Sequence, residues 1–104
     1  MRIISGYLKG KNILLPSDKK TRPLKEMVRE SIFNIIKHTK SFNNNIEHST
    51  VLDLFSGTGS FGLECISRGA SQVIFNENYP LALEILRKNI YNLKCEYKCK
   101  INNH

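Results

Sequence analysis

DLFSGTGSFG, residues 53–62, is the stretch of sequence that decides the fold. It joins a short apolar run, residues 51–55, to a segment whose apolar residues recur at helical spacing. The first pattern indicates a buried strand and the second a helix. Glycines at a strand-to-helix turn let the backbone approach a ligand closely and leave the amide groups of the helix N-terminus facing it. The stretch therefore predicts a ligand-binding turn at the end of a strand.

The alternation of strand and helix continues toward the C-terminus. Gly69 stands where a helix stops, residues 72–75 form a second apolar run, and Pro80 opens another helical pattern. Residues 95–101 predict a third strand. Strands alternating with helices in this order are typical of a parallel sheet. We therefore expect an α/β fold that contains a partial Rossmann-like sheet.

Residues 1–45 carry a different pattern. Two short apolar runs around Gly6 and Gly10 predict a β-hairpin with a basic loop over residues 2–15. Pro23 precedes apolar residues spaced for one helix face, which predicts a helix near residues 24–38. Residues 39–49 show no periodicity. We therefore divide the chain into a basic N-terminal hairpin and helix, residues 1–45, and an α/β domain, residues 46–104.

The composition is that of an ordinary globular protein, with 40% hydrophobic residues in a chain of 104. No apolar run approaches the roughly 20 residues of a membrane span, and the N-terminus lacks a signal-peptide pattern. We therefore expect a cytoplasmic protein without membrane contact. The irregular spacing of Cys65, Cys95 and Cys99 favours reduced thiols over a disulfide framework. Cys95, Cys99 and His104 lack the second ligand pair of a standard zinc site, so no metal is expected.

The net charge of +7 is concentrated in the N-terminal part. Residues 1–45 hold ten Lys and Arg against three Asp and Glu, whereas residues 46–104 hold six of each sign. A local excess of this kind favours contact with an RNA backbone, which releases counterions on binding, although a merely solvated basic surface stays an alternative. Arg29 can instead form a helix-surface pair with Glu30 or pack against the α/β domain. The candidates for phosphate contact are Arg2, Lys9, Lys11, Lys19, Lys20, Arg22 and Arg29.

Two carboxylates suggest which ligand the glycine-rich turn binds. Glu77 follows the second predicted strand, where an acid can accept hydrogen bonds from ribose hydroxyls. Asp53 precedes Gly57 by four positions, at the end of the first strand. The glycines also match the dinucleotide fingerprint G-x-G-x-x-G, but a carboxylate at this position repels a pyrophosphate and attracts the ammonium and sulfonium groups of S-adenosylmethionine. The sequence therefore favours S-adenosylmethionine over a dinucleotide, with a turn that binds no ligand as a further alternative.

Further motifs follow one another along the chain. RIISG at residues 2–6, KGK at 9–11, TRP at 21–23 and VRESIFNI at 28–35 precede the glycine-rich stretch, and GLE at 62–64 and SRGA at 67–70 lie at or beyond its end. With these motifs the chain resembles, from Arg2 to about Asn92, the bacterial family that methylates the exocyclic N2 of a guanine in small-subunit ribosomal RNA.

This resemblance implies a class I methyltransferase fold whose N-terminal extension grips ribosomal RNA or the small ribosomal subunit. It also implies that Glu77 binds the ribose of S-adenosylmethionine. The chain departs mildly from the family pattern, with Ser56 in place of the usual alanine and with Asn76 and Asn78 beside Glu77. The residues that the resemblance places along the methionine end of the cofactor are Asp53, Ser56, Gly57, Thr58 and Gly59.

The larger departure concerns the catalytic loop. Enzymes that methylate an exocyclic amine resemble one another in an Asn/Asp-Pro-Pro-Tyr/Phe loop after the fourth strand. The prolines of this chain are Pro16, Pro23 and Pro80, so no Pro-Pro pair occurs. We therefore assign no catalytic residue and expect a chain truncated before that loop and inactive alone. A non-catalytic RNA-binding remnant and a fragment of a dinucleotide-binding oxidoreductase remain alternatives.

Overall fold

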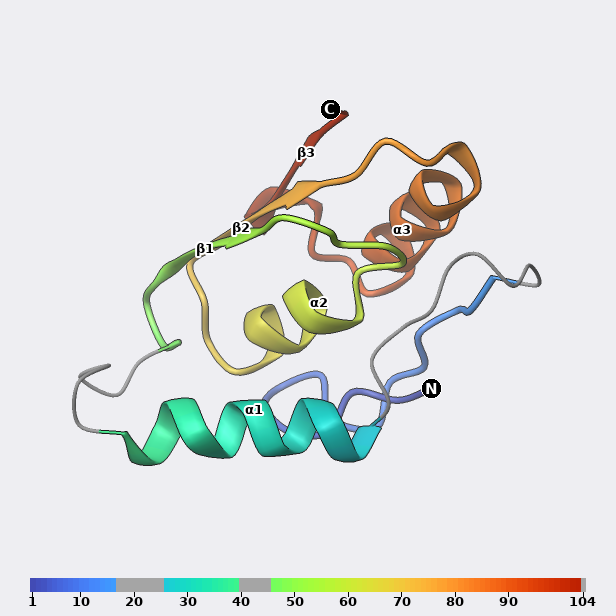
Figure 1. The fold of residues 1–104 in the computed structure, drawn as a ribbon. Coiled ribbons are helices and arrows are strands. Elements are labelled where there is room, and N and C mark those ends of the chain that lie inside the picture. Colours follow the sequence, from blue (N-terminus) through green and yellow to red (C-terminus); the bar gives the residue numbers. More distant parts are fainter. Residues whose placement is uncertain (17–25, 40–45, 104) are drawn as a thin grey trace.

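The computed structural model describes residues 1–16, 26–39 and 46–103. Helices and strands alternate along it as the sequence predicts, and no helix within these ranges is long and apolar enough to cross a bilayer. The elements, shown in Figure 1, are α1 (Glu26–His38), β1 (Thr50–Asp53), α2 (Ser60–Ser67), β2 (Gln72–Asn76), α3 (Pro80–Asn92), a 3-10 turn η2 (Glu96–Lys98) and β3 (Cys99–Asn102).

The three strands form a parallel sheet in the order β1-β2-β3, which confirms the predicted α/β class. Crossovers between parallel strands share one handedness, so two connections that step in the same direction place α2 and α3 on the same face of the sheet. In Figure 1 the helices lie on one side of the strands, with α2 between α1 and the sheet. The carboxyl ends of β1 and β2 therefore lie side by side, with Asp53 in register with Phe75.

Close packing between α2 and β2 fixes the position of the glycine-rich turn. Val73 and Phe75 of β2 are fully buried against the helices. A Cβ atom at Gly62 would lie 2.3 Å from Phe75 Cε1, so only glycine lets α2 approach the strand this closely. Gly62, the third glycine of the G-x-G-x-x-G motif, is thus explained by the packing of α2 on β2 and not by contact with a ligand.

The predicted β-hairpin over residues 2–15 is wrong. Within residues 1–16 one isolated antiparallel bridge forms, between Arg2 and Asn12. Ile3 N still donates across the loop to Lys11 O at 2.9 Å, but the next two amides, those of Ile4 and Ser5, donate to the side chain of Glu64 in α2. The segment is therefore a loop bound to α2, and its basic tip remains exposed.

The position of Gly6 shows how closely this loop is held to the C-terminal turn of α2. Tyr7 N donates to the carbonyl oxygen of Ser67 at 3.0 Å, and Leu8 N donates to its Oγ at 3.0 Å. Gly6 has a φ of +88°, and a Cβ atom there would lie 1.8 Å from the same carbonyl oxygen. Ile3, Leu8 and other residues of the loop join the hydrophobic core of the α/β part. The division at residue 45 stays a prediction, since residues 40–45 lie outside the described ranges.

The third strand is shorter than predicted. Cys95 precedes the turn η2, which takes up residues 96–98, and β3 begins only at Cys99. Lys94 has a φ of 55°, a left-handed conformation that ends α3 and redirects the chain before the strand begins. The alternation of polar and apolar residues in 95–101 did not distinguish this turn from a strand.

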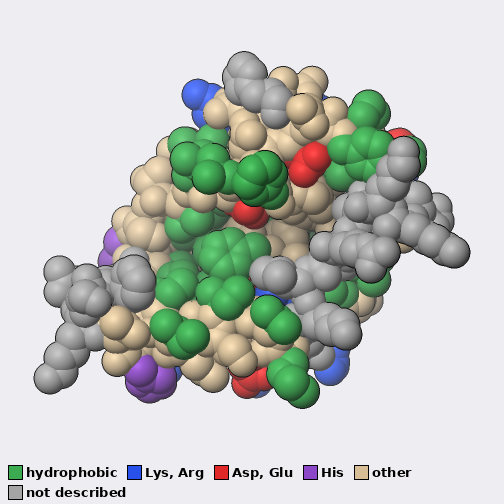
Figure 2. Space-filling model, in the orientation of Figure 1, with side chains coloured by type: hydrophobic (Ala, Val, Ile, Leu, Met, Phe, Trp, Pro, Cys, Tyr) green, Lys and Arg blue, Asp and Glu red, His purple; other side chains and the backbone are tan. Residues whose placement is uncertain are grey.

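One face of the molecule is apolar and carries the open edge of the sheet. Among the described residues, β1 pairs with β2 alone, so its other edge has no neighbouring strand. Figure 2 shows hydrophobic side chains gathered across the face that β1 and α1 present in this view. Of the large apolar side chains on these two elements and on the turn after β1, Met27 is 78% exposed, Leu52 57% and Phe55 92%. Parallel sheets are normally covered, and a large exposed apolar patch favours association.

We expect the isolated chain to self-associate as its concentration rises, because this edge and patch can bind a second copy. Replacing Phe55 with serine and Met27 with lysine should shift the association to higher concentration in sedimentation-velocity experiments. Tyr91→Ser, which removes a 70% exposed ring from α3, is the matched control and should leave association unchanged. A wild-type chain that stays monomeric at every concentration would contradict the expectation.

Candidate functional site

The two carboxylates singled out in the sequence lie at neighbouring strand ends. Asp53 is the last residue of β1, and its Oδ2 accepts a hydrogen bond from Gly62 N at 3.2 Å. Glu77 follows β2, and its Oε1 accepts from Gly57 N at 2.7 Å. The backbone of Glu77 is held in turn by Asn102 of β3, whose carbonyl oxygen lies 3.1 Å from its amide nitrogen. The structure thus brings both acids to the glycine-rich turn, one at each side.

The surroundings of Asp53 disfavour its charged form. Burial raises its pKa to about 6, and the negative charge of Glu77 adds to the rise, whereas the hydrogen bond from Gly62 lowers it. A carboxylate that is costly to ionise in the empty protein is strongly stabilised by a neighbouring cation. The site is therefore suited to a ligand that brings positive charge to Asp53.

The turn between β1 and α2 depends on two glycines in left-handed conformation. Gly57 has a φ of 55° and Gly59 a φ of 93°. A Cβ atom at Gly59 would lie 2.6 Å from Leu86 Cδ1 of α3, so close packing adds to the backbone preference for glycine there. Ser56 is buried, and its Oγ donates to the carbonyl oxygen of Asn76 at 3.3 Å. Its backbone N–H donates to the same oxygen at 3.2 Å, so side chain and backbone together hold the turn to β2.

Thr58 is tied to the N-terminal segment by Asn89, a residue that the sequence analysis missed. Asn89 of α3 is 1% exposed, and its Nδ2 donates to the carbonyl oxygen of Thr58 at 2.9 Å. The same amide group accepts from Leu14 N at 2.7 Å and donates to Leu14 O at 3.2 Å. Its signal in the sequence was a polar residue at the helical spacing of Leu86 and Leu93. Within the described part of the chain, Thr58 Oγ1 is buried without a hydrogen-bond partner.

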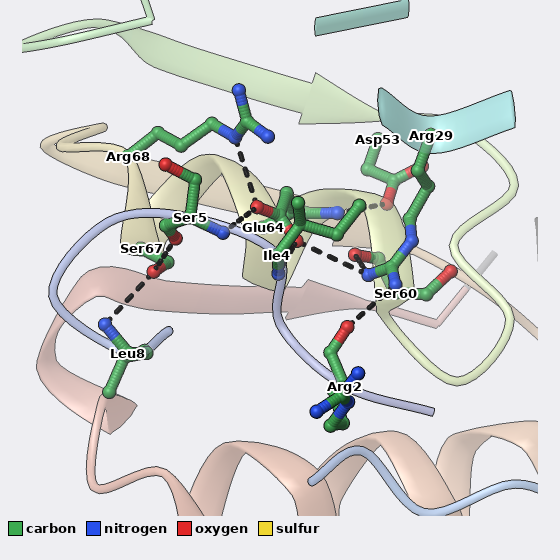
Figure 3. A network of polar contacts seen from close by, with 11 residues as sticks. Arg2, Ile4, Ser5, Leu8, Arg29, Asp53, Ser60, Glu64, Ser67 and Arg68 are labelled. Atoms are coloured by element: carbon green, nitrogen blue, oxygen red, sulfur yellow. Dashed lines mark hydrogen bonds and ion pairs between the residues drawn. The ribbon is translucent and has the colours of Figure 1, made fainter. Parts of the chain in front are cut away.

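A buried polar network beneath the site centres on Glu64 of α2, as Figure 3 shows. Glu64 is fully buried, and its two oxygens accept from Ile4 N at 2.9 Å and from Ser5 N at 3.0 Å. The carboxylate also pairs with Arg29 Nη1 at 3.3 Å and with Arg68 Nε at 2.9 Å. One side chain thus connects α1, α2 and the N-terminal loop. Such a network is needed because an unpaired buried charge is very costly.

Arg29 does not serve as an exposed phosphate contact in this structure. Its side chain is fully buried, and besides pairing with Glu64 it donates to the carbonyl oxygen of Arg2 at 2.7 Å. The alternative in which Arg29 packs against the α/β domain is therefore confirmed. The sequence pattern was ambiguous because a helix-borne arginine suits a charged surface and a buried ion pair equally well.

The other RNA candidates divide into two groups. Arg2, Lys9 and Lys11 are exposed on the N-terminal loop, where they are accessible to a partner. Lys19, Lys20 and Arg22 lie outside the described residues. His104, considered above with the two nearby cysteines, also lies outside them. Among residues 1–16, 26–39 and 46–103 no group of three or more metal-ligating side chains occurs.

Comparison with known proteins gives consistent matches. The chain is 35% identical over 95 residues to ribosomal RNA small subunit methyltransferase D of Haemophilus influenzae, a match covering 91% of the chain and 46% of that protein. The structure of the yhhF protein of Escherichia coli superposes with a TM-score of 0.82 and 29% identity, covering 100% of this chain and 52% of that one.

A more distant match carries a bound ligand. The TYW2 protein of Pyrococcus horikoshii, solved in complex with MeSAdo, superposes with a TM-score of 0.51 at 29% identity, over 57% of this chain and 22% of that one. The chain spans about half the length of the curated relatives that it matches. The model of the family described as Conserved hypothetical protein 95 matches residues 1–104, and the chain therefore belongs to that family, together with its relatives among the small-subunit ribosomal RNA methyltransferases.

Proposed function

We propose that this chain is the S-adenosylmethionine-binding and RNA-contacting portion of a methyltransferase. Its substrate is the exocyclic N2 of a guanine in small-subunit ribosomal RNA. The observation that carries the proposal is the placement of Asp53 and Glu77 at adjacent strand ends, on either side of a turn held open by Gly57 and Gly59. Membership of the family and the name of the Haemophilus influenzae relative support the choice of RNA as substrate.

The residues of the site fit S-adenosylmethionine better than a dinucleotide. Asp53 has a raised pKa because of burial, so a sulfonium or ammonium group beside it relieves an unfavourable charge. A pyrophosphate in the same place would add a second negative charge to a buried carboxylate. Glu77, whose Oε1 already accepts from Gly57 N, retains lone pairs that can accept from ribose hydroxyls. The Pyrococcus horikoshii relative solved with MeSAdo lends further support to an adenosine ligand.

Methyl transfer itself would come from direct attack of the guanine amine on the sulfonium methyl group, with the protein supplying position and hydrogen-bond acceptors. In our proposal those acceptors belong to a segment that the 104 residues do not contain, since no Pro-Pro pair occurs in them. The purified chain should therefore bind cofactor without transferring a labelled methyl group to small ribosomal subunits. Robust, cofactor-dependent transfer by the pure chain would contradict this.

The cofactor assignment is tested by titrating S-adenosylmethionine into Glu77→Gln by calorimetry. We expect a loss of about ten- to hundredfold in affinity, because a charge-assisted hydrogen bond is worth about 1.5–3 kcal/mol. The loss should be similar for S-adenosylhomocysteine and for adenosine compounds that lack the methionine part. Glu84→Gln is the matched control, because Glu84 is an exposed carboxylate of α3 that pairs with Lys88. Unchanged affinity in Glu77→Gln would exclude the proposed ribose contact.

RNA binding by the N-terminal loop predicts a strong dependence on salt. The logarithm of the affinity for a ribosomal RNA fragment should fall linearly with the logarithm of salt concentration. Replacing Lys9 and Lys11 with glutamine should make the slope shallower by about 2, because each lysine that is removed leaves one phosphate group without its countercharge. Lys88→Gln, which removes an exposed lysine of α3, should leave the slope unchanged. A salt-independent affinity would mean that the basic loop does not bind phosphate groups.

A further inference from the structure

Two cysteines lie side by side at the end of the sheet opposite the proposed cofactor site. Cys95 follows α3 and is fully buried, and Cys99 is the first residue of β3 and partly exposed. Their sulfur atoms are 3.8 Å apart. The turn η2 separates them, with Lys98 N donating to Cys95 O at 3.0 Å, so the backbone holds the two side chains on the same side of the turn. All three cysteines of the chain are free thiols.

The two thiols differ in their readiness to ionise. The Cys99 S–H donates to Cys95 Sγ, which lowers the pKa of Cys95 although burial opposes it, and the same bond raises the pKa of Cys99. Cys65 contrasts with both, because burial raises its pKa to about 12. Two thiols in contact, one with a lowered pKa and the other partly exposed, are an arrangement that favours disulfide formation.

We propose that Cys95 and Cys99 are an oxidation site that forms a reversible intramolecular disulfide. A disulfide bond is about 2.05 Å long, so the sulfur atoms need to approach by less than about 2 Å, a distance that side-chain rotation covers. The partial exposure of Cys99 gives a small oxidant a route to the pair. The proposal stands independently of the methyltransferase function, since it rests on residues that take no part in the cofactor site.

A peroxide supplies the two-electron oxidant for this reaction. In the first step the O–O bond breaks, one sulfur takes a hydroxyl group to become a sulfenic acid, and the other oxygen leaves as water with the thiol proton. In the second step the remaining sulfur attacks the sulfenic sulfur, the S–O bond breaks, and the hydroxyl leaves as a second water with the second thiol proton. The pair loses two electrons and two protons, and the peroxide is reduced to two molecules of water.

The disulfide would constrain a turn that touches the N-terminal loop. Lys98 of η2 has its Nζ 5.2 Å from the ring centroid of Tyr7 and 5.6 Å from that of Tyr97. Oxidation would therefore fix the backbone beneath this cluster of two rings and a lysine. The carboxyl ends of the strands, which hold Asp53 and Glu77, lie at the other end of the sheet.

The test treats the folded chain with hydrogen peroxide and measures its mass without reduction. We expect the loss of two hydrogen atoms, restored by dithiothreitol. Trypsin should then release residues 95–98 joined to residues 99–100, because cleavage after Lys94, Lys98 and Lys100 isolates one cysteine in each peptide. This mapping uses the wild-type chain and needs no variant to fold.

Variants separate this pair from the third cysteine. Cys65→Ala should lose two hydrogen atoms as the wild type does, whereas Cys99→Ser should instead gain oxygen. The proposal is overturned if the folded wild-type chain keeps its mass while the urea-unfolded chain loses two hydrogen atoms. It is equally overturned if the peptides show Cys65 in the linkage or a bond between two chains.

Discussion

Replacing Glu64 with glutamine is expected to lower the free energy of unfolding by about 3–5 kcal/mol, the usual cost of removing one partner from a buried ion pair. The carboxylate accepts from two backbone amides of the N-terminal loop and pairs with Arg29, which is fully buried. Glutamine removes the negative charge that pairs with the buried guanidinium of Arg29 at 3.3 Å. Urea unfolding followed by circular dichroism measures the change as a lower midpoint.

The matched control for this measurement is Glu84→Gln, which removes a carboxylate of α3 whose side chain is 62% exposed. Exposed pairs contribute about 0–1 kcal/mol, so this variant should unfold close to the wild-type midpoint. If Glu64→Gln unfolded there as well, the buried network would not hold the N-terminal loop to α2 as the hydrogen bonds indicate.

Replacing Asp53 with asparagine should stabilise the empty protein at neutral pH. The pKa of Asp53 is raised by burial from 3.8 to about 6, so between these values the folded state holds a proton that the unfolded state releases. The free energy of unfolding therefore falls as pH rises from about 4 to 6, by up to about 3 kcal/mol. Asparagine can still accept from Gly62 N and carries no charge. Its advantage over the wild type should grow between about pH 4 and pH 6 and be complete above pH 6.

The same substitution should weaken ligand binding. Asp53→Asn removes the countercharge for the cationic end of S-adenosylmethionine, and we expect affinity to drop by about ten- to hundredfold. Methylthioadenosine, which lacks the methionine end, should bind the variant nearly as it binds the wild type. In Asp53→Asn, calorimetry should therefore show a lower affinity for S-adenosylmethionine than in the wild type, while thermal melts of the empty protein should show a higher stability. Loss of stability together with unchanged cofactor affinity would remove Asp53 from the proposed site.

The α/β part of the fold could be predicted from the sequence because its signals are local. Short apolar runs predicted β1 and β2, and the glycine-rich stretch predicted the turn that the structure places at the end of β1. The two acids could be expected together because parallel strands end at one edge of the sheet. Their contact with a ligand stays a prediction.

The errors concern residues whose partners are distant in sequence. The loop over residues 2–15 has the apolar runs and glycines of a hairpin, but four of its amides donate to Glu64 and Ser67, about 60 residues away. For Arg29 the sequence left surface contact and packing against the α/β domain both open, because nothing near it in sequence reveals its buried partner Glu64. Asn89 was missed because its hydrogen bonds with Leu14 and Thr58 depend on three separate elements.

The Glu64 network also constrains the order in which the chain can fold. Ile4 and its acceptor are 60 residues apart, so a growing chain exposes the N-terminal loop well before its acceptor exists. At a synthesis rate of about 5–20 residues per second, that interval lasts roughly 3 to 12 s. Arg29 emerges in the same interval and remains hydrated until α2 forms. Closure of the loop is therefore a late folding event, because it joins residues that are far apart in sequence.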